Sequence, residues 1–166
     1  MTQAERFATL YGIGHLPGPQ GTYASVATLP LAWALHALGG FWLFLPASIA
    51  IAALAWWATK ATLRDRGLGD GDPQDIVIDE VAGQLIAFWP LSLGLTLTGA
   101  APHVWPWPGV VAAFLLFRLF DIWKPGPIGR AERLPGATGI MADDCAAGLA
   151  AAIVAAVAAG VAHGWF

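Results

Sequence analysis

The sequence has few charged residues for its length. Asp, Glu, Lys and Arg together make up 11% of the 166 residues, whereas hydrophobic residues make up 57%. In soluble domains about a quarter of the residues are charged. We therefore expect residues 1–166 to form a single integral membrane domain.

Other features are also scarce. Cys145 is the only cysteine, which excludes an internal disulfide and a cysteine-based metal site. The formal net charge of −3 and the scattered basic residues give no surface for nucleic acid. Residues 1–10 contain Glu5 and lack the apolar core of a secretory signal, so we expect a short interfacial helix there.

Several phosphate-handling signatures are missing. Residues 12–22 are rich in glycine but do not have the spacing of a Walker A loop. Cys145 is followed by Ala151 where a Cys-x₅-Arg nucleophile loop needs arginine, and the Asp-Gly-x₂-Ala-Arg signature of alcohol phosphatidyltransferases is absent. The glycine-rich stretch is either a connector into the first helix or a lip over a lipid headgroup, with His15, Thr22 or Ser25 as polar contacts.

Long apolar segments are the main feature that is present. A helix needs about 20 apolar residues to cross the hydrocarbon core of a bilayer. Five segments meet this length or approach it: Ala24–Leu38, Phe41–Thr59, Val81–Leu97, Val110–Trp123 and Cys145–Ala162. The sequence therefore predicts an all-α, polytopic helical bundle with about four or five membrane helices and an N-terminal interfacial helix.

The basic residues favour one orientation. If residues 1–21 are cytoplasmic, all eight Lys and Arg residues lie inside or near an inner helix end, and the outer loops carry none. Short cytoplasmic loops retain Lys and Arg in this way. The acidic residues then gather on the same face, because Asp79 and Glu80 begin one span, Asp121 closes the next, and Asp143 and Asp144 open the last.

These carboxylates have two readings. A single Asp at a helix start often serves only as an N-cap. Here two of the sites offer two acids each and Asp121 lies at the wrong end of its helix for a cap, so the set favours a cation site. An all-carboxylate site suits Mg²⁺, and we expect Asp79, Glu80, Asp143 and Asp144 to bind it.

Two cations accompany the acids. Arg118, Asp121 and Lys124 follow one another at intervals of three residues, which places them along one side of a helix. The simple reading is an intrahelical pair of Arg118 with Asp121, but the surrounding residues are apolar and make an isolated pair costly. Arg and Lys beside a metal site favour a phosphorylated substrate.

Four stretches, in this order, resemble the phosphatidylglycerophosphatase A family: Gly14-x-x-Pro17-Gly18 with Gly21-Thr22; Ile76-Val77-Ile78-Asp79-Glu80-x-x-Gly83; Phe117-Arg118-x-x-Asp121-x-x-Lys124-Pro125-x-Pro127-Ile128; and Gly139-Ile140-Met141-x-Asp143-Asp144-x-x-x-Gly148. The resemblance implies an Mg²⁺-dependent helical membrane enzyme that converts phosphatidylglycerophosphate to phosphatidylglycerol and phosphate. We accordingly expect a multi-pass protein of the bacterial inner membrane with its active site on the cytoplasmic side.

The expected mechanism assigns a role to each polar residue. Asp79, Glu80, Asp143 and Asp144 hold one or two Mg²⁺ ions, while Arg118 and Lys124 bind phosphate oxygens. A water activated by the metal attacks phosphorus, and Asp121 is either a further ligand or the general base. An aspartyl-phosphate intermediate stays open as an alternative.

The rival function is a small transporter or a cation- or proton-conducting protein, since buried carboxylates also relay ions. Such a route needs acids at mid-span or on both sides of the membrane. In the predicted topology, the outer loops and the outer ends of the spans carry no charged residue, which favours the enzyme over the transporter. The oligomeric state and the acyl-chain preference are left open.

Overall fold

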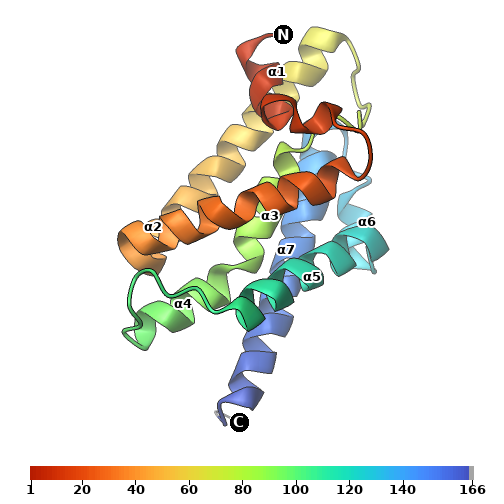
Figure 1. Ribbon diagram of the computed structural model, residues 1–166. Helices are drawn as coiled ribbons and strands as arrows, with labels where there is room; N and C mark the ends of the chain where they lie inside the picture. The colour runs from red at the N-terminus through yellow and green to blue at the C-terminus, as the bar shows by residue number, and fades with distance from the viewer. Residues whose placement is uncertain (165–166) are drawn as a thin grey trace.

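The computed structural model describes residues 1–164, and all regular secondary structure among them is helical (Figure 1). This confirms the all-α prediction. The elements in chain order are α1 (Gln3–Ala8), the 3₁₀ helix η1 (Leu10–His15), α2 (Gln20–Arg66), α3 (Ile78–Ala87), α4 (Trp89–Leu97), α5 (Trp107–Trp123), α6 (Pro127–Ala131) and α7 (Gly136–Ala162).

The long helix α2 is a hairpin of two helices rather than one straight rod. The turn lies at Gly39 and Gly40, where the backbone leaves helical geometry and Gly40 takes a φ of 57°, a conformation that favours glycine. Figure 1 shows the two arms of α2 diverging from this turn. The glycine pair therefore divides α2 into a helical hairpin.

Within residues 1–164, three helical segments are long and apolar enough to cross a membrane: Gln20–Arg66, Ile78–Leu97 and Gly136–Ala162. The helix α5 has 17 residues, which falls short of the length of about 20 that a perpendicular span needs. Large apolar side chains on the outside of the bundle, such as Ile122 and Ile153, are 72% and 64% exposed, as lipid-facing residues would be. The structure thus supports a membrane bundle, and four or five spans stay a prediction.

The start of the last helix differs from our expectation. We predicted that Asp143 and Asp144 open it, but α7 begins at Gly136 and continues through them. The apolar stretch before the two acids extends the helix upstream, because Ile140 and Met141 are buried and pack in the core. The two acids therefore lie about two turns inside α7.

The helices α3 and α7 touch through their backbones. A Cβ atom added to Gly148 would lie 2.3 Å from the carbonyl oxygen of Gly83, and one added to Gly83 would lie 2.6 Å from the carbonyl oxygen of Asp144. Small residues allow helix backbones to approach this closely. Since Glu80 precedes Gly83 by one turn and Asp144 precedes Gly148 by one turn, this contact brings the two acids together.

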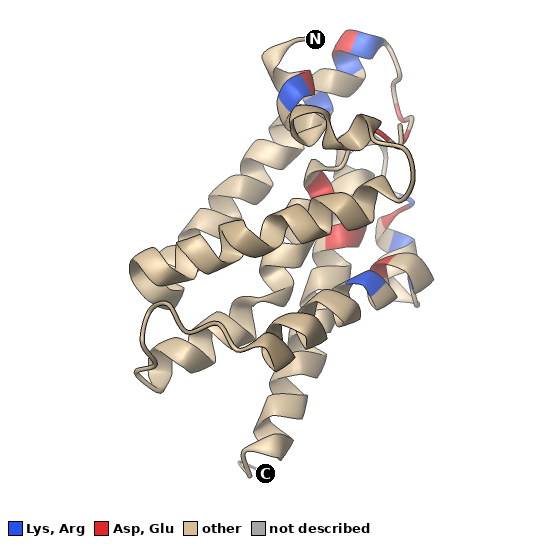
Figure 2. Ribbon diagram, viewed as in Figure 1, with Lys and Arg blue, Asp and Glu red and all other residues tan. Residues whose placement is uncertain are grey.

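Charged residues gather toward one end of the molecule. In Figure 2 the Lys, Arg, Asp and Glu positions lie around α1, the far end of α2, the beginnings of α3 and α7, and the segment from α5 to α6. The turn of α2, α4 and the C-terminal part of α7 are without charge in the same view. This arrangement matches the one-sided charge distribution that the sequence predicts.

Candidate active site

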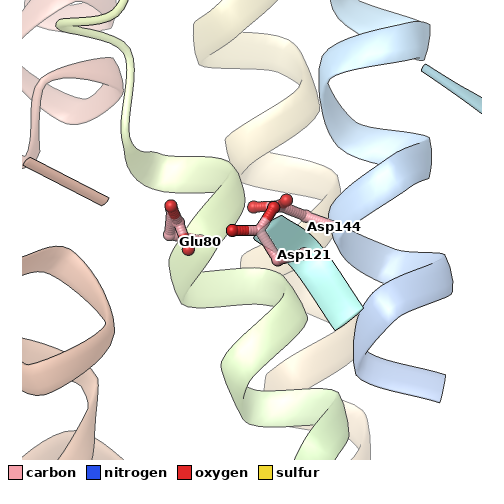
Figure 3. Close-up of side chains that lie close together, drawn as sticks. All are labelled: Glu80, Asp121 and Asp144. Carbon is pink, nitrogen blue, oxygen red and sulfur yellow. The ribbon is translucent and has the colours of Figure 1, made fainter. Parts of the chain in front are cut away.

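Three carboxylates from three helices meet in the charged half of the bundle. Glu80 of α3, Asp121 of α5 and Asp144 of α7 each place an oxygen within 4.8 Å of the other two (Figure 3). The side chains of Glu80 and Asp144 are buried, and that of Asp121 is only 12% exposed. We call these residues the three-carboxylate group.

Arg118 joins two members of the group. Its Nη1 forms an ion pair with Glu80 and lies 3.0 Å from Oδ2 of Asp121, one turn further along α5. The intrahelical pair that the spacing predicts is therefore present, but the guanidinium also links α5 to α3. Its buried Nε has no hydrogen-bond partner among the described residues, so Arg118 retains a donor.

The first turns of α2 cover Glu80 from another side. Ser25 Oγ donates a hydrogen bond of 3.1 Å to Glu80 Oε2. A Cβ atom on Gly21 would lie 1.8 Å from Glu80 Oε1, so only glycine permits this approach. The closeness of Gly21 could not be predicted, because nothing local in the sequence shows which residue a glycine faces.

Lys124 lies beside the three-carboxylate group at the end of α5. Its Nζ lies 2.6 Å from Asp143 Oδ2 and 2.8 Å from Glu132 Oε1. Burial alone would lower the pKa of Lys124, but the hydrogen bonds and charges of these two carboxylates outweigh it and raise that pKa above its ordinary value. Lys124 is therefore a permanent cation, and Glu132 is a partner that sequence reasoning missed.

The two acidic pairs are divided by the geometry of their helices. Successive residues of an α-helix point about 100° apart, since one turn holds about 3.6 residues. Accordingly, Glu80 and Asp144 belong to the three-carboxylate group, whereas Asp79 and Asp143 lie outside it, although Asp79 is close enough to repel both Asp143 and Asp144. Of the four predicted metal ligands, the structure brings two directly together with Asp121.

His15 and Thr22 occupy different places. His15 Nδ1 lies 3.7 Å from Asp75 Oδ2 in the loop before α3. Thr22 is half-buried in the first turn of α2, beside Gly21. Thr22 is thus a neighbour in sequence of Gly21, which lies against Glu80, whereas His15 belongs to a separate ionic cluster.

This ionic cluster is centred on Arg66 and was not predicted. The guanidinium donates hydrogen bonds of 2.9 and 2.7 Å to Asp75, and two more to Glu5. The guanidinium of Arg66 holds the pKa of Asp75 below its usual value, because its hydrogen bonds and charge favour the ionised carboxylate, against a smaller opposing effect of burial. We call Arg66, Asp75 and Glu5 the Arg66 clasp; it ties α1 and the end of α2 to the loop that leads into α3.

The donor set fits a divalent cation. Five acids, Asp79, Glu80, Asp121, Asp143 and Asp144, gather around Arg118 and Lys124, and Glu132 also pairs with Lys124, so the six carboxylates and two cations carry a formal charge of −4. Buried carboxylate oxygens without a hydrogen-bond partner among the described residues occur on Asp79, Asp143 and Asp144. Buried like charges are costly unless a cation or proton intervenes. Oxygen-only donors of this kind are those that Mg²⁺ and Ca²⁺ prefer.

A family model and two of the relatives identify the same family. The sequence model of the family described as phosphatidylglycerophosphatase A matches residues 6–159. The chain is 32% identical to phosphatidylglycerophosphatase A of Escherichia coli (strain K12) over 143 residues, which cover 86% of this chain and 75% of the relative. It is 35% identical to the protein of the same name from Haemophilus influenzae over 141 residues, or 84% of this chain and 78% of the relative.

A third relative carries a different name. A Bacteroides thetaiotaomicron protein, provisionally named phosphatidylinositol-3-phosphatase, is 34% identical over 146 residues, which cover 85% of this chain and 84% of the relative. No solved structure matches the chain.

Proposed function

The chain belongs to the phosphatidylglycerophosphatase A family, and on this premise we propose that it removes the terminal phosphate of phosphatidylglycerophosphate at the three-carboxylate group. The family match and the two relatives of that name support phosphatase activity toward this lipid. They do not favour the alternative of a transporter or ion-conducting protein.

The convergence of Glu80, Asp121 and Asp144 is the observation that carries the proposal. These three residues, with Asp79 and Asp143 beside them, are the candidates to hold Mg²⁺. When bound, a divalent cation neutralises charge on the phosphate and makes a water molecule easier to deprotonate. The Mg²⁺ dependence rests on the donor set and on the excess of negative charge.

The protein's own cations bind the substrate. Arg118 and Lys124 lie on either side of Asp121 along α5, and both are partly buried, so their attraction for phosphate oxygens is stronger than at an open surface. Both also offset the charge that develops as phosphorus is attacked. Arg118 is fixed by Glu80 and Asp121, and Lys124 by Asp143, which holds the two cations ready before the lipid arrives.

Asp121 is suited to take a proton from the attacking water. Its side chain is 12% exposed, and its Oδ2 lies 3.0 Å from Nη1 of Arg118, which holds the carboxylate in position to accept a proton. Ser25 keeps Glu80 in a fixed orientation through its hydrogen bond, so the group does not need to rearrange during the reaction.

The apolar helices place this chemistry next to lipid. The acyl chains can stay in the bilayer while the headgroup reaches the charged end of the bundle. The enrichment of Lys and Arg at that end supports its placement on the cytoplasmic face of a bacterial inner membrane.

Phosphate release by the purified protein tests the proposal. The substrates are phosphatidylglycerophosphate and, because of the Bacteroides relative, phosphatidylinositol 3-phosphate, each with Mg²⁺ and with a chelator. We expect release from phosphatidylglycerophosphate with Mg²⁺ and none with the chelator. Equal activity with Mg²⁺ and with the chelator would contradict the Mg²⁺ dependence. Phosphate release only from phosphatidylinositol 3-phosphate would contradict phosphatidylglycerophosphate as the substrate.

A further inference from the structure

Lys124 has two carboxylate partners that differ in how firmly they are held. Asp143 lies inside the bundle with a side chain that is 7% exposed, and its oxygen is 2.6 Å from the ammonium. Glu132 lies at the surface of the bundle with a side chain that is 50% exposed, and its Oε1 lies 2.8 Å from the same ammonium. Of the two partners, only Glu132 is open at the surface of the bundle.

The main chain of Glu132 is fixed although its side chain is not. Its amide donates a hydrogen bond of 3.2 Å to the carbonyl of the buried Ile128. Its carbonyl oxygen lies over Gly139 of α7, where an added Cβ atom would come within 3.0 Å. The carboxylate can therefore leave Lys124 by rotation of the side chain alone, without a movement of the backbone.

Charge favours such a departure when phosphate binds. One ammonium and two carboxylates give this local group a formal charge of −1, which repels a phosphomonoester dianion. If Glu132 turns away, Lys124 and Asp143 together are neutral and a hydrogen-bond donor of the ammonium becomes available. Binding of phosphate is thus coupled to the loss of the contact between Lys124 and Glu132.

We propose that Glu132 is an exchangeable counter-ion of Lys124, which phosphate must displace, and that it sets the affinity of the site for the phosphomonoester and for the released phosphate. This inference rests on the proposed function, in which Lys124 binds phosphate. When a ligand binds only to protein in which a contact is open, its apparent affinity equals its intrinsic affinity multiplied by the fraction of protein with that contact open. Glu132 therefore weakens phosphate binding and speeds the release of the product.

The variant Glu132→Gln tests this role. Glutamine keeps the size of the side chain and an acceptor for Lys124 but removes the charge. Ion pairs of this exposure shift an equilibrium about two- to fivefold. We expect inorganic phosphate to bind the full-length variant about two- to fivefold more tightly than the wild type, by calorimetry in detergent with Mg²⁺. The inhibition constant of phosphate and the KM for phosphatidylglycerophosphate should fall by the same factor.

A control variant makes the result specific. Asp65→Asn removes one negative charge from the exposed pair with Arg64, whose atoms are 3.2 Å apart, and should leave phosphate affinity unchanged. This control separates the local contact from a general change in net charge.

An unchanged or weaker phosphate affinity of Glu132→Gln would overturn the inference. So would a lower melting temperature with no change in affinity, because Glu132 would then have a structural role only. Failure of the proposed function has a different signature, which is a wild-type protein that releases no phosphate from phosphatidylglycerophosphate.

Discussion

Replacing Gly148 by alanine tests whether the backbone contact between α3 and α7 sets the position of the carboxylates. The new Cβ atom would lie 2.3 Å from the carbonyl oxygen of Gly83 and 3.1 Å from Cβ of Ile86. Ordinary contacts begin at 3.4 Å, and the nearest atom belongs to the backbone, so a side-chain rotation cannot relieve the clash. The two helices would have to separate by about 1 Å.

That separation has a cost in both stability and activity. Overpacking of this kind typically lowers the free energy of unfolding by about 1–3 kcal/mol. Because Glu80 and Asp144 each lie one turn from the contact, they would move apart by a similar distance. A misplacement of about 1 Å can reduce turnover about 100-fold, so we expect a loss of this order in phosphate release.

Gly94→Ala is the matched control. Gly94 lies within α4 at a helical backbone geometry, and an added Cβ atom would meet nothing within 4 Å. This variant should melt and turn over as the wild type does. The measurements are the melting temperature in detergent and the initial rate of phosphate release. Wild-type turnover and stability in Gly148→Ala would refute the view that the contact positions the site.

Three other predictions follow from the site and the Arg66 clasp. Asp144→Asn should insert and fold but lose about 100-fold or more of its phosphate release, since it removes one of three converging charges; near-normal turnover would exclude Asp144 from the site. Mg²⁺ should raise the melting temperature of the wild type after chelator treatment but not that of Asp144→Asn, and an equal rise in both would place the cation elsewhere. Asp75→Asn should lower stability at neutral pH by about 1 kcal/mol or less, because its partner Arg66 is partly exposed. The pKa of Asp75 is lowered in the folded protein, so the stability that Asp75 contributes is complete above the ordinary aspartate pKa of about 3.9 and is lost as the pH falls through the folded-state pKa. The melting temperatures of the wild type and Asp75→Asn should therefore converge at acid pH. A difference in melting temperature that persists at acid pH would contradict the role of the ion pair.

The apolar segments and the one-sided charge could be predicted from the sequence because the bilayer imposes a length and a composition on each span. The turn at Gly39–Gly40 has a local signal of the same kind. The start of α7 has none, since Ile140 and Met141 suit a loop packed on the core as well as a helix. Local composition therefore predicts where the helices lie but does not predict where each of them begins and ends.

The members of the site depend on how the helices rotate against one another. Hydropathy does not show which residue of the pair Asp79 and Glu80 faces a neighbour, and that orientation decides which carboxylates meet. The contact of Lys124 with Glu132 and the Arg66 clasp join residues of separate elements, so neither has a periodic pattern in the sequence. Such contacts come from packing alone.

The Arg66 clasp has a practical meaning for anyone who attaches a purification tag. Glu5 lies in α1, only a few residues from the N-terminus, and through Arg66 it is connected to the loop that carries the chain into α3. A bulky fusion at this terminus would compete for space with the clasp. The C-terminal part of α7 lies at the opposite, uncharged end of the bundle (Figures 1 and 2), so a tag placed there would leave the clasp and the carboxylates undisturbed.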